Sequence, residues 1–207
     1  RFAPLTGGTT AGDTWQDSTQ EALATFESGI KQIVPGVIYN GYIASSVTND
    51  VNVGTILTTG LGTNLLPANF WIVGKTLRIT LRGIYSTDAV TPGTLQIAIK
   101  SNTNVEALTA AFTPPLAGDA TTSFEVSLLL TCISSGAGPM TVRVSGGIQM
   151  STVTTGASVF RPILGDAGAD GIPDAGNPTV AWSSNDVAQT IDVTADWGTA
   201  DADNGIV

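Results

Sequence analysis

The side chains best spaced to bind a metal ion lie between Asp166 and Asn177. Oxygen-bearing side chains recur there at Asp166, Asp170, Asp174 and Asn177, and Gly171 directly follows the second of them. Calcium takes about six to eight oxygen ligands in a loop whose sharp turn favours glycine. Calcium is therefore the one cofactor that this pattern would suit.

The same segment resembles the calcium-binding repeats of thrombospondin type 3. Gly168 stands where that repeat carries an aspartate, so one ligand is missing. The other interpretation is a surface loop in which Asp, Gly and Pro simply form turns. We favour the surface loop and expect the protein to need no cofactor.

The histidine, cysteine and glutamate content of the chain gives little support for a catalytic site. The chain has no histidine, which excludes Ser-His-Asp and Cys-His catalysis and histidine-bound zinc. Its single cysteine, Cys132, is expected to act as a small buried hydrophobic residue. A glycosidase needs two carboxylates at a set separation. No spacing among Glu21, Glu27, Glu106 and Glu125 singles out a pair, because Glu106 is expected in a loop and Glu125 on an outward strand position. We expect no enzyme.

Aromatic side chains offer a binding alternative. Phe70, Trp71 and Tyr85 stand near expected strand ends, where they would either stack on sugars or close the ends of a hydrophobic core. We favour the second interpretation, and we expect Trp197 to cover an edge of the core.

Net charge and hydrophobicity indicate which partners the protein is expected to lack. Eight basic residues against 17 acidic ones give a net charge of -9, and the basic residues are scattered, so we expect no nucleic acid. No apolar stretch approaches the roughly 18 residues of a membrane-spanning helix, so we expect no membrane. Only 12% of residues are charged, which favours an assembly over a free monomer. The eight aspartates after Arg161 form either an acidic binding face or, as we favour, a solvated surface.

The N-terminal 35 residues are expected to differ from the rest. Residues 1–12 are small, polar and rich in glycine, which predicts an arm. Apolar residues then recur with a spacing of about 3.6, which predicts one amphipathic helix that ends at Pro35-Gly36. An exposed helix could dock on a neighbouring subunit, or the helix could pack on its own domain. The best candidates for partner binding are Trp15, Phe26 and Ile30.

Residues 36–207 show a period of two, typical of strands. Leu77, Ile79 and Leu81 alternate with Arg78, Thr80 and Arg82, and a longer apolar row runs from Phe124 to Cys132. Gly146-Gly147 is expected to form a bulge in a later strand. About eight strands punctuated by Gly, Pro, Ser and Asn predict an all-β, antiparallel jelly-roll sandwich. We place it as one domain over residues 36–207.

Two segments carry a resemblance to a known family. They are Leu65–Asn69 with Val73–Ile79, and Thr190–Asn204 around the sequence Trp197-Gly198-Thr199-Ala200. Both resemble the jelly-roll domains of virion structural proteins of tailed bacteriophages. Such domains usually continue into a full final strand, whereas this chain stops at Val207, so we expect the last strand to be truncated or completed by a partner.

The resemblance implies a non-enzymatic role in a virus particle. It suggests a capsid decoration or cement protein, a homotrimer that binds across subunits of the major capsid protein and stabilises the shell. The expected location is the capsid surface, after assembly in the host cytoplasm, and no small-molecule substrate is expected. The alternative is a receptor-binding or carbohydrate-binding jelly-roll module of a tail fibre, in which the long segments 101–122 and 160–178 would form the contact surface.

Overall fold

The computed structural model describes residues 14–17, 22–27, 30–33, 39–41, 47–48, 54–57, 60–115, 122–134, 140–152, 158–165, 179–182, 185–199 and 201–207. The chain divides into two compact units. The first holds residues 1–42 and 60–64, and the second holds residues 43–59 and 65–207. The domain boundary expected after residue 35 and the arm over residues 1–12 both fall outside the described residues, and both remain predictions.

The first unit contains strands where the sequence predicted a helix. β1 (Thr14–Asp17), β2 (Ala22–Glu27) and β3 (Ile30–Ile33) form an antiparallel sheet in the order β1-β2-β3. A short pair, β4 (Tyr39–Gly41) with β7 (Gly60–Gly62), completes the described part of this unit. The helix prediction is therefore wrong, and the structure has no helix among its described residues.

The physical reason lies in turn chemistry that outweighs the helical spacing. Glu27 pairs directly with Ile30, so Ser28 and Gly29 connect β2 to β3. Ser-Gly is a turn-forming dipeptide, and two residues suffice to join antiparallel strands. Threonine and phenylalanine within β2 also favour strands over helices. The Ser28-Gly29 sequence therefore favours two strands over one helix.

The second unit is a sandwich of two antiparallel sheets, as the sequence predicted at that level of detail. Within the described residues, its larger sheet has seven strands and follows the path β14-β13-β12-β9-β18-β5, with β16 paired to β13. These strands are β14 (Ser158–Pro162), β13 (Met140–Ser151), β12 (Thr122–Ser134), β9 (Thr76–Ser86), β18 (Gly205–Ile206), β5 (Val47–Thr48) and β16 (Thr179–Trp182).

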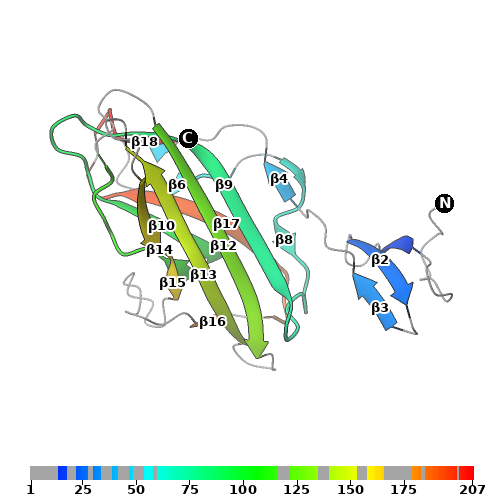
Figure 1. Cartoon of the computed structure of the whole chain (residues 1–207). Helices are drawn as coiled ribbons and strands as arrows, with labels where there is room; N and C mark the ends of the chain where they lie inside the picture. The colour runs from blue at the N-terminus through cyan, green and yellow to red at the C-terminus, as the bar shows by residue number, and fades with distance from the viewer. Residues whose placement is uncertain are drawn as a thin grey trace. The chain divides into compact units, whose positions relative to one another are not determined.

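In the part of the chain that the structure describes, the smaller sheet has six strands and follows the path β15-β11-β10-β17-β6, with β8 paired to β17. These strands are β15 (Leu164–Gly165), β11 (Asn104–Leu108), β10 (Leu95–Ser101), β17 (Gln189–Trp197), β6 (Gly54–Thr55) and β8 (Leu65–Leu66). Figure 1 shows β9, β12 and β13 side by side, with β10 and β17 in the layer behind them.

The core between the sheets confirms the alternation expected from sequence. The inward row of β12, from Phe124 to Cys132, is buried, whereas the residues between are more exposed. Trp71, Trp182 and Trp197 are almost fully buried, and the rings of Trp71 and Trp182 meet edge to face at 5.3 Å. Large aromatic side chains therefore supply much of the apolar surface that the sandwich removes from water.

One local prediction in this sheet is wrong. The pairing of β12 with β13 runs without a shift through Leu128–Gly146 and Ser127–Gly147, so these glycines do not form a bulge. Instead, a β-carbon at either position would overlap a neighbouring backbone carbonyl, of Ser127 or of Arg161. Glycine is required here because other strands approach closely.

The described residues include no helix long and apolar enough to span a membrane.

Candidate functional site

The outward positions of β9, β12, β13 and β14 form one continuous face of the seven-stranded sheet, which we call the outer sheet face. Strict alternation places these residues, because each apolar inward residue is followed by an outward one. This side of the strands faces away from the second sheet and toward the viewer in Figure 1. The outer sheet face comprises Thr76, Arg78, Thr80, Arg82, Ile84, Ser123, Glu125, Ser127, Leu129, Thr131, Thr141, Arg143, Ser145, Gln149, Ser151, Ser158, Phe160 and Pro162.

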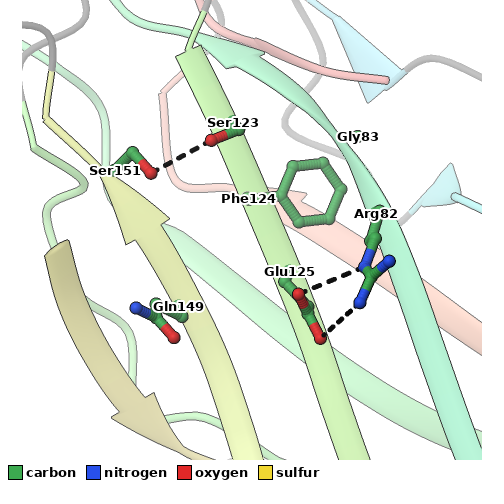
Figure 2. A pocket seen from close by; sticks show the side chains of 7 residues that line it. All are labelled: Arg82, Gly83, Ser123, Phe124, Glu125, Gln149 and Ser151. Carbon is green, nitrogen blue, oxygen red and sulfur yellow. Dashed lines mark hydrogen bonds and ion pairs between the residues drawn. The ribbon is translucent and has the colours of Figure 1, made fainter.

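A shallow hollow of about 350 Å³ lies at one end of this face. Figure 2 shows the side chains that line it, from β9, β12 and β13. Direct cross-strand pairing sets Arg82 opposite Glu125, Glu125 opposite Gln149, and Gln149 opposite Phe160. The hollow thus combines hydrogen-bond donors and acceptors, with an aromatic side chain on the next strand.

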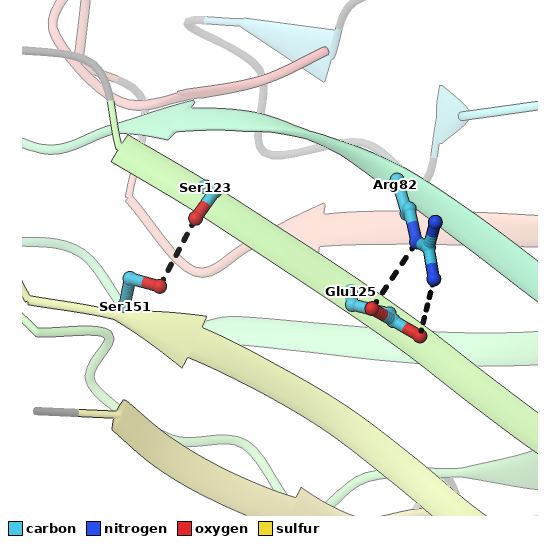
Figure 3. Close-up of polar contacts among 4 residues, drawn as sticks. All are labelled: Arg82, Ser123, Glu125 and Ser151. Atoms are coloured by element: carbon cyan, nitrogen blue, oxygen red, sulfur yellow. Dashed lines mark hydrogen bonds and ion pairs between the residues drawn. The ribbon is translucent and has the colours of Figure 1, made fainter.

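Two polar pairs cross the strands at the hollow, as Figure 3 shows. Arg82 Nε donates to Glu125 Oε2 at 3.2 Å, and Arg82 Nη2 donates to Glu125 Oε1 at 3.5 Å, so the guanidinium binds the carboxylate through two hydrogen bonds. The hydroxyl groups of Ser123 and Ser151 lie 3.0 Å apart. Because 74% of the Arg82 side chain is exposed, the ion pair contributes only about 0–1 kcal/mol to stability. Its role is therefore to orient charged groups at the surface.

Gly83 fixes the neighbouring strand at the hollow. A β-carbon there would overlap the backbone carbonyl of Val207 and press on the ring of Phe124. Ile84 and Val207 exchange two backbone hydrogen bonds of 2.9 and 2.8 Å. The absence of a side chain at Gly83 therefore allows the C-terminal residues to pair with β9.

The composition of the outer sheet face departs from that of the whole chain. It carries three of the eight basic residues, Arg78, Arg82 and Arg143, but Glu125 is its only acidic residue among 17 in the chain. Three large apolar side chains are also exposed on it: Ile84 at 45%, Leu129 at 38% and Phe160 at 55%. Enrichment in arginine with depletion of Lys, Asp and Glu is typical of protein interfaces.

Acidic residues gather at a different place, which we call the aspartate cluster. Carboxylate oxygens of Asp88, Asp201 and Asp203 all lie within 4.8 Å of one another. Asp88 follows the end of β9, and the other two lie between β17 and β18. Such a group offers oxygen ligands to a divalent cation, although calcium takes about six to eight in total.

Hydrogen bonds within the cluster point to a turn. The Asp88 carboxylate accepts the N–H groups of Thr91 at 2.5 Å and of Val90 at 2.8 Å, and these bonds lower the pKa of Asp88. The side-chain oxygen of Asn204 accepts the N–H of Asp88 at 3.1 Å. Among the described residues its amide nitrogen has no partner, but an N–H donor does not ligate a cation. These contacts hold the loop in place.

Asp166, Asp170, Asp174 and Asn177, the calcium candidates, lie outside the described residues.

The three candidates for partner binding lie on β1, β2 and β3. Trp15 pairs with Ala24, two residues before Phe26, so Trp15 and Phe26 occupy positions on one face of the small sheet. Ile30 pairs with Glu27 and therefore occupies a position on the other face. A helix would have placed all three on one side.

Predictions for the sandwich residues are tested directly. Trp71 and Tyr85 are each 1% exposed, so they close the core and do not offer stacking surfaces. Cys132 is buried, as expected, and burial raises the pKa of its thiol. Trp197 is buried, and its indole N–H donates to the carbonyl of Val47.

Glu106 corrects an expectation. It lies in β11 rather than in a loop, and it is buried and hydrogen-bonded by the Ser101 hydroxyl. Glu125 does face outward, as predicted.

Sequence reasoning missed both surface clusters. The alternation of Arg78 and Arg82 with Ile79 and Leu81 is visible in the sequence and could have revealed the basic strand face. The aspartate cluster joins Asp88 to residues more than a hundred positions later, and no local pattern signals it. No protein-family model, curated protein or solved structure matches the chain.

Proposed function

We propose that the chain is a non-enzymatic structural protein of a virus particle, of the capsid decoration or cement type. In this proposal the sandwich has jelly-roll connectivity and sits on the capsid surface after assembly in the host cytoplasm. Its partners are the major capsid protein and further copies of itself, in a trimer. It stabilises the shell by burying surface across neighbouring subunits.

The observation that carries the proposal is the outer sheet face. It offers hydroxyl groups, arginines and exposed apolar side chains, including Leu129 and Phe160, with a single acidic residue. Hydroxyl and apolar groups make up most of this face, and its carboxylate already pairs with Arg82, so no unpaired carboxylate of this face would have to lose water when it meets another protein. This favours a protein that works by surface burial.

The experiment is to measure the copy number of the protein in purified particles by quantitative peptide mass spectrometry against the major capsid protein. Copies comparable with the capsid protein are expected. Absence from particles would overturn the proposal. The second measurement removes residues 1–35, which should leave a folded sandwich that no longer binds the particle, and retained binding would refute a docking role for that segment.

A second candidate is a receptor-binding or carbohydrate-binding module of a tail fibre. The observation in its favour is Phe160, which is 55% exposed and pairs directly with Gln149 at the polar hollow. An aromatic ring beside donors and acceptors is an arrangement that can stack on a sugar. A few copies per particle, together with loss of cell attachment in Phe160→Ala but not in Val187→Ala, would favour this candidate.

A further inference from the structure

Two groups of like charge lie far apart along the long strands of the sandwich: Arg78 with Arg143, and the aspartate cluster. Arg78 lies near the start of β9, and Asp88 follows the end of the same strand, ten residues later. At about 3.3 Å per strand residue, the two positions are roughly 30 Å apart. Arg143 lies near the Arg78 end, because it pairs with Thr131, which pairs with Thr76 at the start of β9. Arg78 and Arg143 therefore lie at the opposite end of the sheet from the aspartate cluster.

Neither group is neutralised by the described part of its own unit. The ion pair recorded for the outer sheet face involves Arg82, and within the described residues Arg78 and Arg143 have no carboxylate partner. The aspartate cluster holds three carboxylates within 4.8 Å, and no basic side chain pairs with them among those residues. Like charges this close repel one another, so a cation brought to the cluster is favoured.

Charge complementarity limits which surfaces of two copies can bind each other. If the outer sheet faces of two copies met with their strands running in the same direction, arginine would face arginine and the contact would be repulsive. The complementary contact places the outer sheet face of one copy against an acidic surface of another. Such a head-to-tail contact uses two different patches, and it closes into a ring when the rotation between copies permits.

We propose that the chain associates with itself head to tail, with Arg78 and Arg143 of one copy seated on the aspartate cluster of the next. Leu129 lies directly opposite Arg78 and is 38% exposed, so it supplies apolar surface beside the ionic contact. Arginine suits this role because its planar group can bind two carboxylate oxygens at once. This inference rests on the proposed function, since it names the surfaces that would build the proposed trimer.

The experiment is sedimentation equilibrium and light scattering of the purified full chain over a range of concentrations, at low and at high salt. The wild type is expected to associate at low salt and to dissociate as salt screens the contact. Arg78→Glu/Arg143→Glu should weaken association by about tenfold or more, which corresponds to about 1.4 kcal/mol or more. Lys100→Glu/Arg161→Glu makes the same change in net charge at positions outside the outer sheet face and should associate as the wild type does.

A charge-exchange test makes the pairing specific. Asp201→Lys/Asp203→Lys alone should also weaken association, because two basic patches then face each other. Mixing this variant with Arg78→Glu/Arg143→Glu should restore it, since each face then meets the opposite charge. Circular dichroism and melting curves establish that all variants are folded.

Two results would overturn the inference: a wild type that stays monomeric at every concentration in low salt, or an association that the charge reversals leave unchanged. Either result leaves the copy number in particles untouched, so failure of this contact is distinguishable from failure of the proposed function.

Discussion

The indole Nε1 of Trp182 donates a hydrogen bond of 2.7 Å to the side-chain oxygen of Gln189, and both residues are buried. Trp182 belongs to β16 of the seven-stranded sheet and Gln189 to β17 of the six-stranded sheet, so the bond crosses the core. An unpaired indole N–H inside an apolar core would carry its full desolvation cost. This contact therefore specifies how the two sheets are aligned.

Gln189→Leu should destabilise the protein by about 1–3 kcal/mol, because it leaves the Trp182 N–H without its acceptor. In a Trp182→Phe background the same change should cost less, since no N–H remains to be satisfied. Chemical denaturation of the two single variants and the double variant measures this coupling. Thr190→Ser, on the neighbouring outward position, serves as the control. Fully additive effects would contradict the prediction.

The core could be predicted from sequence, whereas the N-terminal sheet could not. Alternation along β9, β12, β13 and β17 is a direct consequence of strand geometry, so the inward rows and the outward position of Glu125 follow from the residue order. Residues 14–33 satisfy a helical spacing as well as a strand pattern. The Ser28-Gly29 sequence favours strands, but the pairing of Glu27 with Ile30 that distinguishes the two is a tertiary contact.

The surface clusters show a second limit of sequence reasoning. Asp88 and Asp201 become neighbours only because β9 and β18 lie side by side in the sheet. Glu106 alternates with apolar residues in β11, yet its burial depends on Ser101 in the adjacent strand. Neither the proximity of Asp88 to Asp201 nor the burial of Glu106 can be predicted from loop length or local composition, because both depend on the order of strands in the sheets.

Gly83→Ala should destabilise the protein by about 1–3 kcal/mol, because the added methyl group overlaps the carbonyl of Val207 and must displace it. The damage should be local to the C-terminal strand. Hydrogen exchange of the Ile84 and Val207 amides, which bond each other's carbonyls, is expected to accelerate together. Thr80→Ala on the same strand is the control. Unchanged protection of both amides would show that β18 does not depend on this glycine.

Asp88 should make the stability of the fold depend on pH in the acid range. Backbone N–H bonds from Thr91 and Val90 lower the pKa of its carboxyl in the folded protein, although Asp201 and Asp203 lie close by. A depressed folded pKa stabilises the fold above the unfolded pKa of about 4, and this contribution is lost as the pH falls through the folded value. Asp88→Asn should therefore flatten the acid limb of a melting-temperature profile. Asp196→Asn, on the other sheet, is the matched substitution, and an equal effect of both would contradict a specific role for Asp88.

Chelation should change the melting temperature little. We favour turn-forming loops over calcium sites both for Asp166–Asn177 and for the aspartate cluster, so EDTA removes no ligand that the fold needs. Ligands that bind only the folded state raise its stability, so a clear rise with added calcium would reverse this preference. Asp170→Asn and Asp203→Asn would then show which segment binds, because only the variant at the true site should lose the rise.

Tyr85 should make the fold sensitive to alkali. Its hydroxyl donates to the carbonyl of Ser151 at 2.5 Å, and burial raises its pKa to about 12. Because the folded pKa lies above the unfolded value of about 10, the stabilising effect is complete below pH 10 and is lost as the pH rises toward 12. Tyr85→Phe cannot ionise, so its stability should fall less over this range, after an initial loss of one buried hydrogen bond. Denaturation midpoints measured from neutral to alkaline pH test this. Parallel curves for the two proteins would show that Tyr85 ionises as easily in the folded state as in the unfolded chain.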